Sequence, residues 1–175
     1  GIVPLGAVDG NNLIATMDNQ ALPQGVHAWL ESPGLAIPNV INGFNLTFHH
    51  WYHLHTYSAP SGYGDGSWVE ASLDGGASWV YLVPDGGYDN QIAHSAPVPS
   101  GASGSGFGVW ASPNASRWQA ASFNLDNLQG LNNASSIKFR FSVWTDPNSP
   151  VQRPGWFIDE VNLTNQGADL GAWFH

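Results

Sequence analysis

The sequence predicts an all-β protein, one antiparallel two-sheet jelly-roll sandwich, and three observations carry this prediction. Strand and turn formers dominate the composition: the chain has nine Trp, eight Phe, five Tyr and 21 Gly, whereas the helix formers Lys, Glu and Met are scarce. About eight segments with strand-like patterns are separated by turns rich in Gly, Pro or Asp. No segment has convincing 3.6-residue periodicity. The length of 175 residues suits one domain.

The chain opens on an apolar segment, GIVPLGAVDGNNLI. We expect residues 1–14 to form an extended N-terminal arm and residues 15–175 to form the single sandwich domain. An apolar arm needs a surface to pack on, either on its own domain or on a neighbouring molecule whose sheet it completes. The residues expected to mediate such assembly are Ile2, Val3, Leu5 and Val8.

The first strands follow the arm. Residues 26–38 predict a strand that is broken at Pro33-Gly34, and residues 44–54 (FNLTFHHWYHL) predict a long half-buried strand. Its inward face is expected to carry Phe44, Leu46, Phe48, His50, Tyr52 and Leu54.

A hairpin is predicted next. Strands at 68–73 and 78–83 are joined by Asp74-Gly75-Gly76, and an Asp-Gly pair between alternating segments is a strong hairpin signal. Residues 84–106 form the longest loop, which we expect to be functional or mobile. The remaining strands are expected at residues 107–110, 118–125, 137–144 and 155–164.

Charge and cysteine content exclude several classes of partner and site. Thirteen acidic residues face only four basic ones, so the surface repels nucleic acid and anionic membranes. The chain contains no cysteine, which excludes disulfides, thiolate metal sites and a cysteine nucleophile. No apolar run approaches the length of a transmembrane span.

Six stretches resemble one known jelly-roll module. They are residues 30–33, 46–52, 65–79 (including DGGASW), 118–125, 138–141 with Asp146, and 155–161 (GWFIDEV). The module is found in MAM-like domains and in the accessory jelly-roll domains of immune-inhibitor-A-type secreted metalloproteases. The resemblance implies an extracellular sandwich that serves as a spacer, adhesive or accessory domain, and it is specific for fold rather than function.

Asp159 is the most informative single residue. In a regular strand it shares the buried face with Phe157, Val161 and Leu163, and a buried carboxylate needs a cation or several hydrogen-bond donors. The resemblance implies a structural calcium at Asp159. The remaining candidate ligands are Asp65, Glu70 and Asp18. The alternative is that Asp159 accepts hydrogen bonds from backbone amides or from Tyr or Trp side chains.

Four histidines close in sequence, His49, His50, His53 and His55, raise the question of a transition-metal site. No carboxylate stands at a diagnostic spacing, and no HExxH motif occurs. We therefore expect His50 to be a hydrogen-bonded core residue and the other three to lie at the surface or in an interface.

Two surface features point to glycans. Trp51 and Trp144 fall opposite the apolar strand faces, so they are the candidates for a platform on which sugar rings stack; the alternative is that they are core or sheet-surface residues. Four N-x-S/T sequons are candidate glycosylation sites: Asn45, Asn114, Asn133 and Asn162.

Three functions compete. The first is a non-catalytic extracellular or cell-surface subunit, structural or adhesive, that carries a structural calcium. It would assemble with itself into a filament or lattice, or with other surface proteins, through its arm. The second is a carbohydrate-binding accessory module of a secreted hydrolase. The third, which we consider the weakest, is a small metal-dependent enzyme that uses the histidines.

Overall fold

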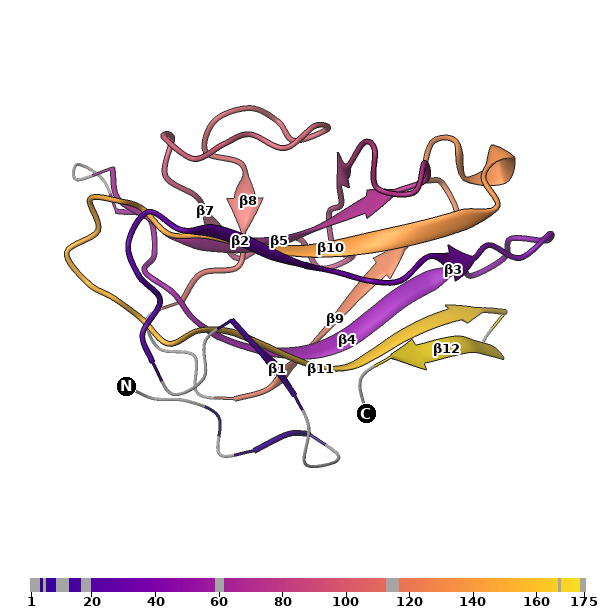
Figure 1. Cartoon of the computed structure of the whole chain (residues 1–175), viewed down its shortest axis with the longest axis horizontal. Coiled ribbons are helices and arrows are strands. Elements are labelled where there is room, and N and C mark those ends of the chain that lie inside the picture. The colour runs from indigo at the N-terminus through magenta and orange to yellow at the C-terminus, as the bar shows by residue number, and fades with distance from the viewer. Residues whose placement is uncertain are drawn as a thin grey trace.

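The computed structural model describes residues 4, 6–8, 13–16, 20–58, 62–112, 117–166 and 168–173. Over these residues the chain forms two five-stranded antiparallel sheets and one two-stranded sheet, which confirms the predicted all-β sandwich. Figure 1 shows the two large sheets stacked as layers. None of the helical structure in this part of the chain is long and apolar enough to cross a membrane.

We call the two large sheets A and B. Sheet A contains β1 (Ile14–Ala15), β4 (Asn45–His53), β9 (Gln119–Asn124), β11 (Gly155–Asn165) and β12 (Ala168–Trp173). Sheet B contains β2 (His27–Glu31), β3 (Leu35–Ala36), β5 (Gly66–Ser72), β6 (Val80–Tyr81) and β10 (Ser136–Trp144). The small sheet pairs β7 (Asn90–Gln91) with β8 (Gly108–Val109), and a 3₁₀ turn, η1, spans Leu131–Asn133. As expected, Pro33 and Gly34 separate β2 from β3.

Strand pairing gives the wiring of a jelly roll. In sequence order, the strands that make up the two sheets before β12 are β1, β2 with β3, β4, β5, β6, β9, β10 and β11. β1 pairs with β11, β2 and β3 pair with β10, β4 pairs with β9, and β5 pairs with β6. This is the pairing of one long hairpin rolled up so that β11 also meets β4 and β10 also meets β5.

The core lies between the sheets and is rich in aromatic rings. The alternation predicted for residues 44–54 is confirmed, because all six side chains assigned to the inward face are buried. Phe48 sits at the centre, with the rings of Phe141, Trp110 and Phe123 between 5.3 and 6.0 Å away. Such edge-to-face and offset contacts add stability beyond the burial of apolar area.

The N-terminal segment covers part of the outer face of sheet A. Trp51 and Phe157 form a small second cluster there, packed against Leu13, Ala15 and Trp118. The indole Nε1 of Trp118 donates to the carbonyl of Gly6 at 3.1 Å. The described contacts of the predicted arm are therefore with its own domain. β1 begins at Ile14, one residue inside that arm, and Ile2, Val3 and Leu5 lie outside the described residues.

A β-bulge interrupts β11. Asp159 pairs with His49 and Asn162 with Thr47, so that Glu160 and Val161 both stand opposite the single residue Phe48. Glu160 takes a left-handed backbone conformation with φ 51°. The bulge reverses the alternation: Phe157 and Asp159 face outward from sheet A, whereas Val161 and Leu163 enter the core. The prediction that Asp159 shares a face with Val161 and Leu163 is therefore wrong.

Candidate functional site

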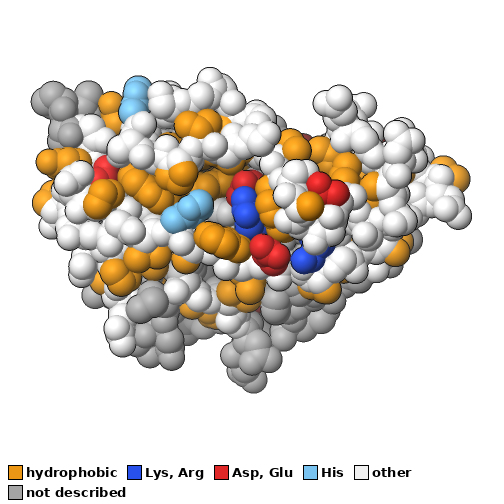
Figure 2. Space-filling model, turned by 45° about the horizontal axis from the view of Figure 1, so that its top comes forward, with side chains coloured by type: hydrophobic (Ala, Val, Ile, Leu, Met, Phe, Trp, Pro, Cys, Tyr) orange, Lys and Arg blue, Asp and Glu red, His pale blue; other side chains and the backbone are white. Residues whose placement is uncertain are grey.

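The outer face of sheet B carries an exposed cluster of aromatic and charged side chains. His27, Trp29 and Glu31 alternate outward along β2, opposite Ser142 and Arg140 of β10. The view in Figure 2 comes from this side of the molecule and shows hydrophobic side chains gathered around a few basic and acidic groups. Trp29 is 51% exposed, which is unusual for an indole in a strand.

Arg140 is the centre of this cluster. Its Nε and Nη2 donate to the two carboxylate oxygens of Glu70, at 3.0 and 2.7 Å. Glu70 is only 2% exposed and also accepts a hydrogen bond from Ser142 Oγ at 2.8 Å. Because a planar guanidinium fork matches a carboxylate, this arrangement fixes Arg140 in one orientation.

Two indole rings contact the fixed guanidinium. Arg140 Cζ lies 4.5 Å from the ring centroid of Trp79 and 5.4 Å from that of Trp29, both within the range of cation–π attraction. We call the set of Trp29, Trp79, Arg140 and Glu70 the Trp–Arg face. It joins residues from β2, β10, β5 and the β5–β6 turn on one surface.

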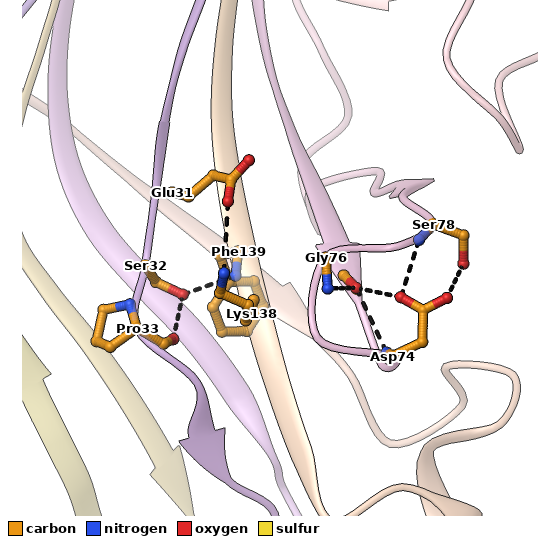
Figure 3. A network of polar contacts seen from close by, with 9 residues as sticks. Glu31, Ser32, Pro33, Asp74, Gly76, Ser78, Lys138 and Phe139 are labelled. Atoms are coloured by element: carbon orange, nitrogen blue, oxygen red, sulfur yellow. Dashed lines mark hydrogen bonds and ion pairs between the residues drawn. The ribbon is translucent and has the colours of Figure 1, made fainter.

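The β5–β6 turn places Trp79. Asp74 accepts hydrogen bonds from Ser72 Oγ at 2.7 Å, from the Ser78 amide at 2.9 Å and from Ser78 Oγ at 2.5 Å, which closes the turn (Figure 3). Gly76 has φ 104° and lies against Trp79 and the ammonium of Lys138. The DGGASW motif thus holds the Trp79 ring beside Arg140.

Two further groups flank the face. Lys138 Nζ lies 3.4 Å from Glu31 Oε2, so this pair, like Arg140 with Glu70, carries no net charge (Figure 3). His27 contacts the rings of Trp29 and Trp68. Burial lowers the pKa of His27 below its usual value of 6.5, and Glu70 opposes that shift. The imidazole is therefore neutral at pH 7.

This arrangement suits a flat, uncharged ligand. Exposed indole offers an apolar surface for stacking, and the paired charges around it leave no net attraction for an ion. The Glu70 clamp holds Arg140 and the closed turn places Trp79, so these two side chains lose little entropy on binding. A phosphate-bearing ligand is disfavoured because the whole chain carries a net charge of −9.

The structure does not assemble the predicted calcium ligands. Asp159 is fully buried, but its oxygens accept the amides of Val8 at 2.6 Å and Glu160 at 2.9 Å. This is the alternative in which backbone donors satisfy the carboxylate.

The other candidate ligands are also engaged elsewhere. Asp65 accepts the amides of Asp146 and His55, and burial raises its pKa. Glu70 and its partner Arg140 both lie on sheet B, whereas Asp159 lies on sheet A. Asp18 lies outside the described residues. Among the residues described, no three His, Asp or Glu side chains group closely enough to hold a metal. Within the described part of the chain, Asp159, Asp65 and Glu70 therefore do not form one cluster.

The four histidines occupy different environments. His50 is 2% exposed and its Nδ1 accepts the indole N–H of Trp156 at 3.2 Å, so it is a hydrogen-bonded core residue as predicted. His53 is buried, contrary to its expected position at the surface or in an interface, because it faces the cluster around Trp51. His55 Nδ1 lies 2.9 Å from Ser149 Oγ.

His49 is the histidine that borders a hollow. Its Nδ1 lies 2.5 Å from Glu160 Oε2, the side chain that the bulge redirects. The pair borders a space of about 310 Å³ over the outer face of sheet A, which Thr47, Asn162 and Ser122 also line. Ser122 Oγ is bonded to the carboxylate of Asp85, so it is not a free nucleophile.

The burial of Trp51 and Trp144 supports the alternative to the glycan platform, in which both are core residues. Trp51 is 2% exposed because the N-terminal segment covers it, and Trp144 is 7% exposed at the end of β10. Neither ring offers a free face for stacking. Trp29 and Trp79 were missed, although the alternation of His27, Trp29 and Glu31 against Ala28 and Leu30 could have identified the first.

Three of the four sequons lie in the described part of the chain. Asn45 and Asn162 are half-buried on the outer face of sheet A. Their side-chain amides donate to the backbone carbonyls of Gly43 and Glu160, respectively. Asn133 is exposed in η1, which makes it the most accessible of the three. Asn114 lies outside the described residues.

No protein-family model matches the chain, and no curated protein matches it significantly in sequence. The functional assignment therefore depends on the geometry of the site.

Proposed function

We propose that the chain is a non-catalytic, extracellular adhesive module that binds a neutral glycan on the Trp–Arg face. The observation that carries the proposal is the half-exposed indole of Trp29 beside a guanidinium that Glu70 clamps in place. Its composition, rich in Trp, Gly, Ser and Asn, and its resemblance to modules of secreted proteins favour an extracellular location.

A sugar ring fits the chemistry of this face. The axial C–H groups of a pyranose form an apolar patch that stacks on indole, and its hydroxyls need fixed donors and acceptors at the rim. Lys138 and Glu31 supply such groups next to Trp79 and Trp29. Self-assembly through the N-terminal arm has weaker support, because Gly6 and Val8 bond to their own domain.

The test is retention on neutral polysaccharides, measured by affinity electrophoresis, followed by calorimetry with oligosaccharides of the polymer that retains the chain. Trp29→Ala should weaken binding by about 10- to 100-fold, because the stacking surface is lost. Trp29→Tyr should restore part of the affinity, since it returns an aromatic face.

Val40→Ala is the matched control, since Val40 is 65% exposed and lies outside the Trp–Arg face. It should bind as the unmodified chain does. Failure of every neutral polysaccharide to retain the chain, or equal affinity of Trp29→Ala and Val40→Ala, refutes the proposal.

A further inference from the structure

The β2 edge of sheet B is unpaired by any residue that the structure describes. Within the described part of the chain, β2 pairs with β10 on one side and is the last strand of its sheet on the other. Exposed edges with apolar side chains are templates for pairing with another chain, and proteins usually protect them with proline, lysine or bulges. β2 (HAWLE) has none of these and carries the exposed Trp29.

The backbone groups that β2 presents can be identified. The Ser32 amide donates to the Phe139 carbonyl at 2.8 Å, and the Thr145 amide donates to the Val26 carbonyl at 2.9 Å. Antiparallel bonds alternate along a strand, so Ala28 and Leu30 also face β10. The N–H and C=O groups of His27, Trp29 and Glu31 therefore point away from the sheet.

This edge is complementary to itself. If two copies of β2 pair antiparallel about a two-fold axis at Trp29, each outward-facing residue meets an outward-facing residue. Trp29 then stands opposite Trp29, and His27 of each copy stands opposite Glu31 of the other. An imidazole and a carboxylate are compatible partners whether or not the histidine carries a proton.

The core-facing side chains of β2 are also complementary to those of a second copy. A hollow of about 210 Å³ opens between β1 and β2, and its walls include Ile14, Ala28, Leu30 and Phe141. In the same register, Ala28 of each copy stands opposite Leu30 of the other at the mouth of this hollow. The pairing therefore covers apolar surface on the inner face while it joins aromatic rings on the outer face.

We propose that two copies of this chain associate through β2, in the register centred on Trp29, to form one continuous sheet across the two-fold axis. The proposal does not depend on glycan binding. The contact is small, because each strand contributes five residues, so the dimer is expected to be weak and concentration-dependent.

The first test is sedimentation velocity from about 10 µM to about 1 mM, the range in which a small interface associates. Glu31→Pro removes an outward N–H, which an edge strand tolerates, and it should leave the chain monomeric with an unchanged circular dichroism spectrum. A chain that is monomeric throughout the range, or a dimer that Glu31→Pro retains, overturns the proposal.

The second test fixes the register by charge exchange. Glu31→Lys and His27→Glu should each weaken the dimer by about tenfold, because each alters both symmetry-related pairs. Combining the two substitutions places a carboxylate opposite an ammonium in both pairs and should restore association. This register is contradicted if neither single substitution changes the affinity of the dimer. It is also contradicted if the double variant loses as much affinity as the two single variants together.

The third test uses the absence of cysteine from the chain. Opposed residues of a hydrogen-bonded antiparallel pair have Cα atoms about 5.5 Å apart, within disulfide range. Trp29→Cys should therefore oxidise to a covalent dimer. Val80→Cys, on the other edge of sheet B and 43% exposed, is the control and should stay monomeric. Cross-linking at Val80 in place of Trp29 overturns the proposal.

Discussion

Lowering the pH from 7 to 5 should destabilise the sandwich, because His50 is buried as a neutral imidazole. Burial lowers the pKa of His50 to about 3, and the neighbouring His49 adds to the shift. The rings of Phe48, Tyr52 and Trp110 surround the imidazole at 4.4 to 5.4 Å, and its Nδ1 accepts from Trp156. A proton on this ring would lack solvation, and a protonated Nδ1 could not accept that hydrogen bond.

The sign and size follow from linkage. In the unfolded chain this histidine binds a proton with its ordinary pKa of 6.5. Between pH 6.5 and pH 3 the unfolded state therefore holds more protons, and the free energy of unfolding falls as the pH falls. Each pH unit is equivalent to about 1.4 kcal/mol, so the loss between pH 7 and pH 5 is about 2 kcal/mol. The free energy of unfolding of a typical domain is only about 5–15 kcal/mol in total.

The assay is urea unfolding at pH 7 and pH 5, followed by tryptophan fluorescence. Other groups also titrate: burial lowers the pKa of His27, which acts in the same direction, and raises that of Asp65, which acts in the opposite one. His50→Asn isolates the effect, because the amide oxygen replaces Nδ1 as acceptor for Trp156 and does not titrate. If the unmodified chain loses no more stability between the two pH values than His50→Asn does, the argument fails.

Two further predictions concern the backbone and the buried carboxylate. Gly155 has φ 106°, and a Cβ there would overlap Thr16 Oγ1 and lie 2.8 Å from Leu22 Cδ1, so Gly155→Ala should cost about 2–4 kcal/mol in urea unfolding. Gly86→Ala, where a Cβ meets no atom within 4 Å, should change stability by less than about 0.5 kcal/mol; equal effects would contradict the close approach. Asp159→Asn can accept the amide of Val8 or that of Glu160 with its one oxygen but not both, and should cost about 1–3 kcal/mol while exposing the N-terminal segment to faster proteolysis. Unchanged cleavage would show that Val8 is not held by this bond.

The sequence predicts which side chains face inward in strands with strict alternation. It fails to do so where the backbone departs from that alternation. β4 keeps a period of two, so its inward residues were predicted correctly from Phe44 to Leu54. The bulge at Glu160 inserts one residue and turns Asp159 to the outer face. No local pattern in GWFIDEV marks that insertion, because Glu tolerates left-handed φ poorly and gives no glycine signal.

Trp51 was a poor candidate for the aromatic platform for a different reason. Strand parity gives the side of a sheet but does not reveal what covers that side. Trp51 and Trp29 both point outward from their sheets, yet the segment around Leu13 covers the first and nothing described covers the second. Since that covering comes from residues far away in the sequence, periodicity within a strand cannot distinguish a buried outer face from an exposed one.

The two proposals meet at Trp29. Its strand forms the edge of sheet B, and the centroids of the Trp29 and Trp79 rings are no more than about 10 Å apart, because Arg140 Cζ lies 5.4 Å from the first and 4.5 Å from the second. Pairing through β2 would place two Trp–Arg faces side by side on one surface, related by the two-fold axis at Trp29. Two weak sites held on one rigid sheet act together only on a ligand long enough to reach both, because the second contact then becomes intramolecular. Dimerisation would therefore favour long polymers over short oligosaccharides without any change in the contacts at either site.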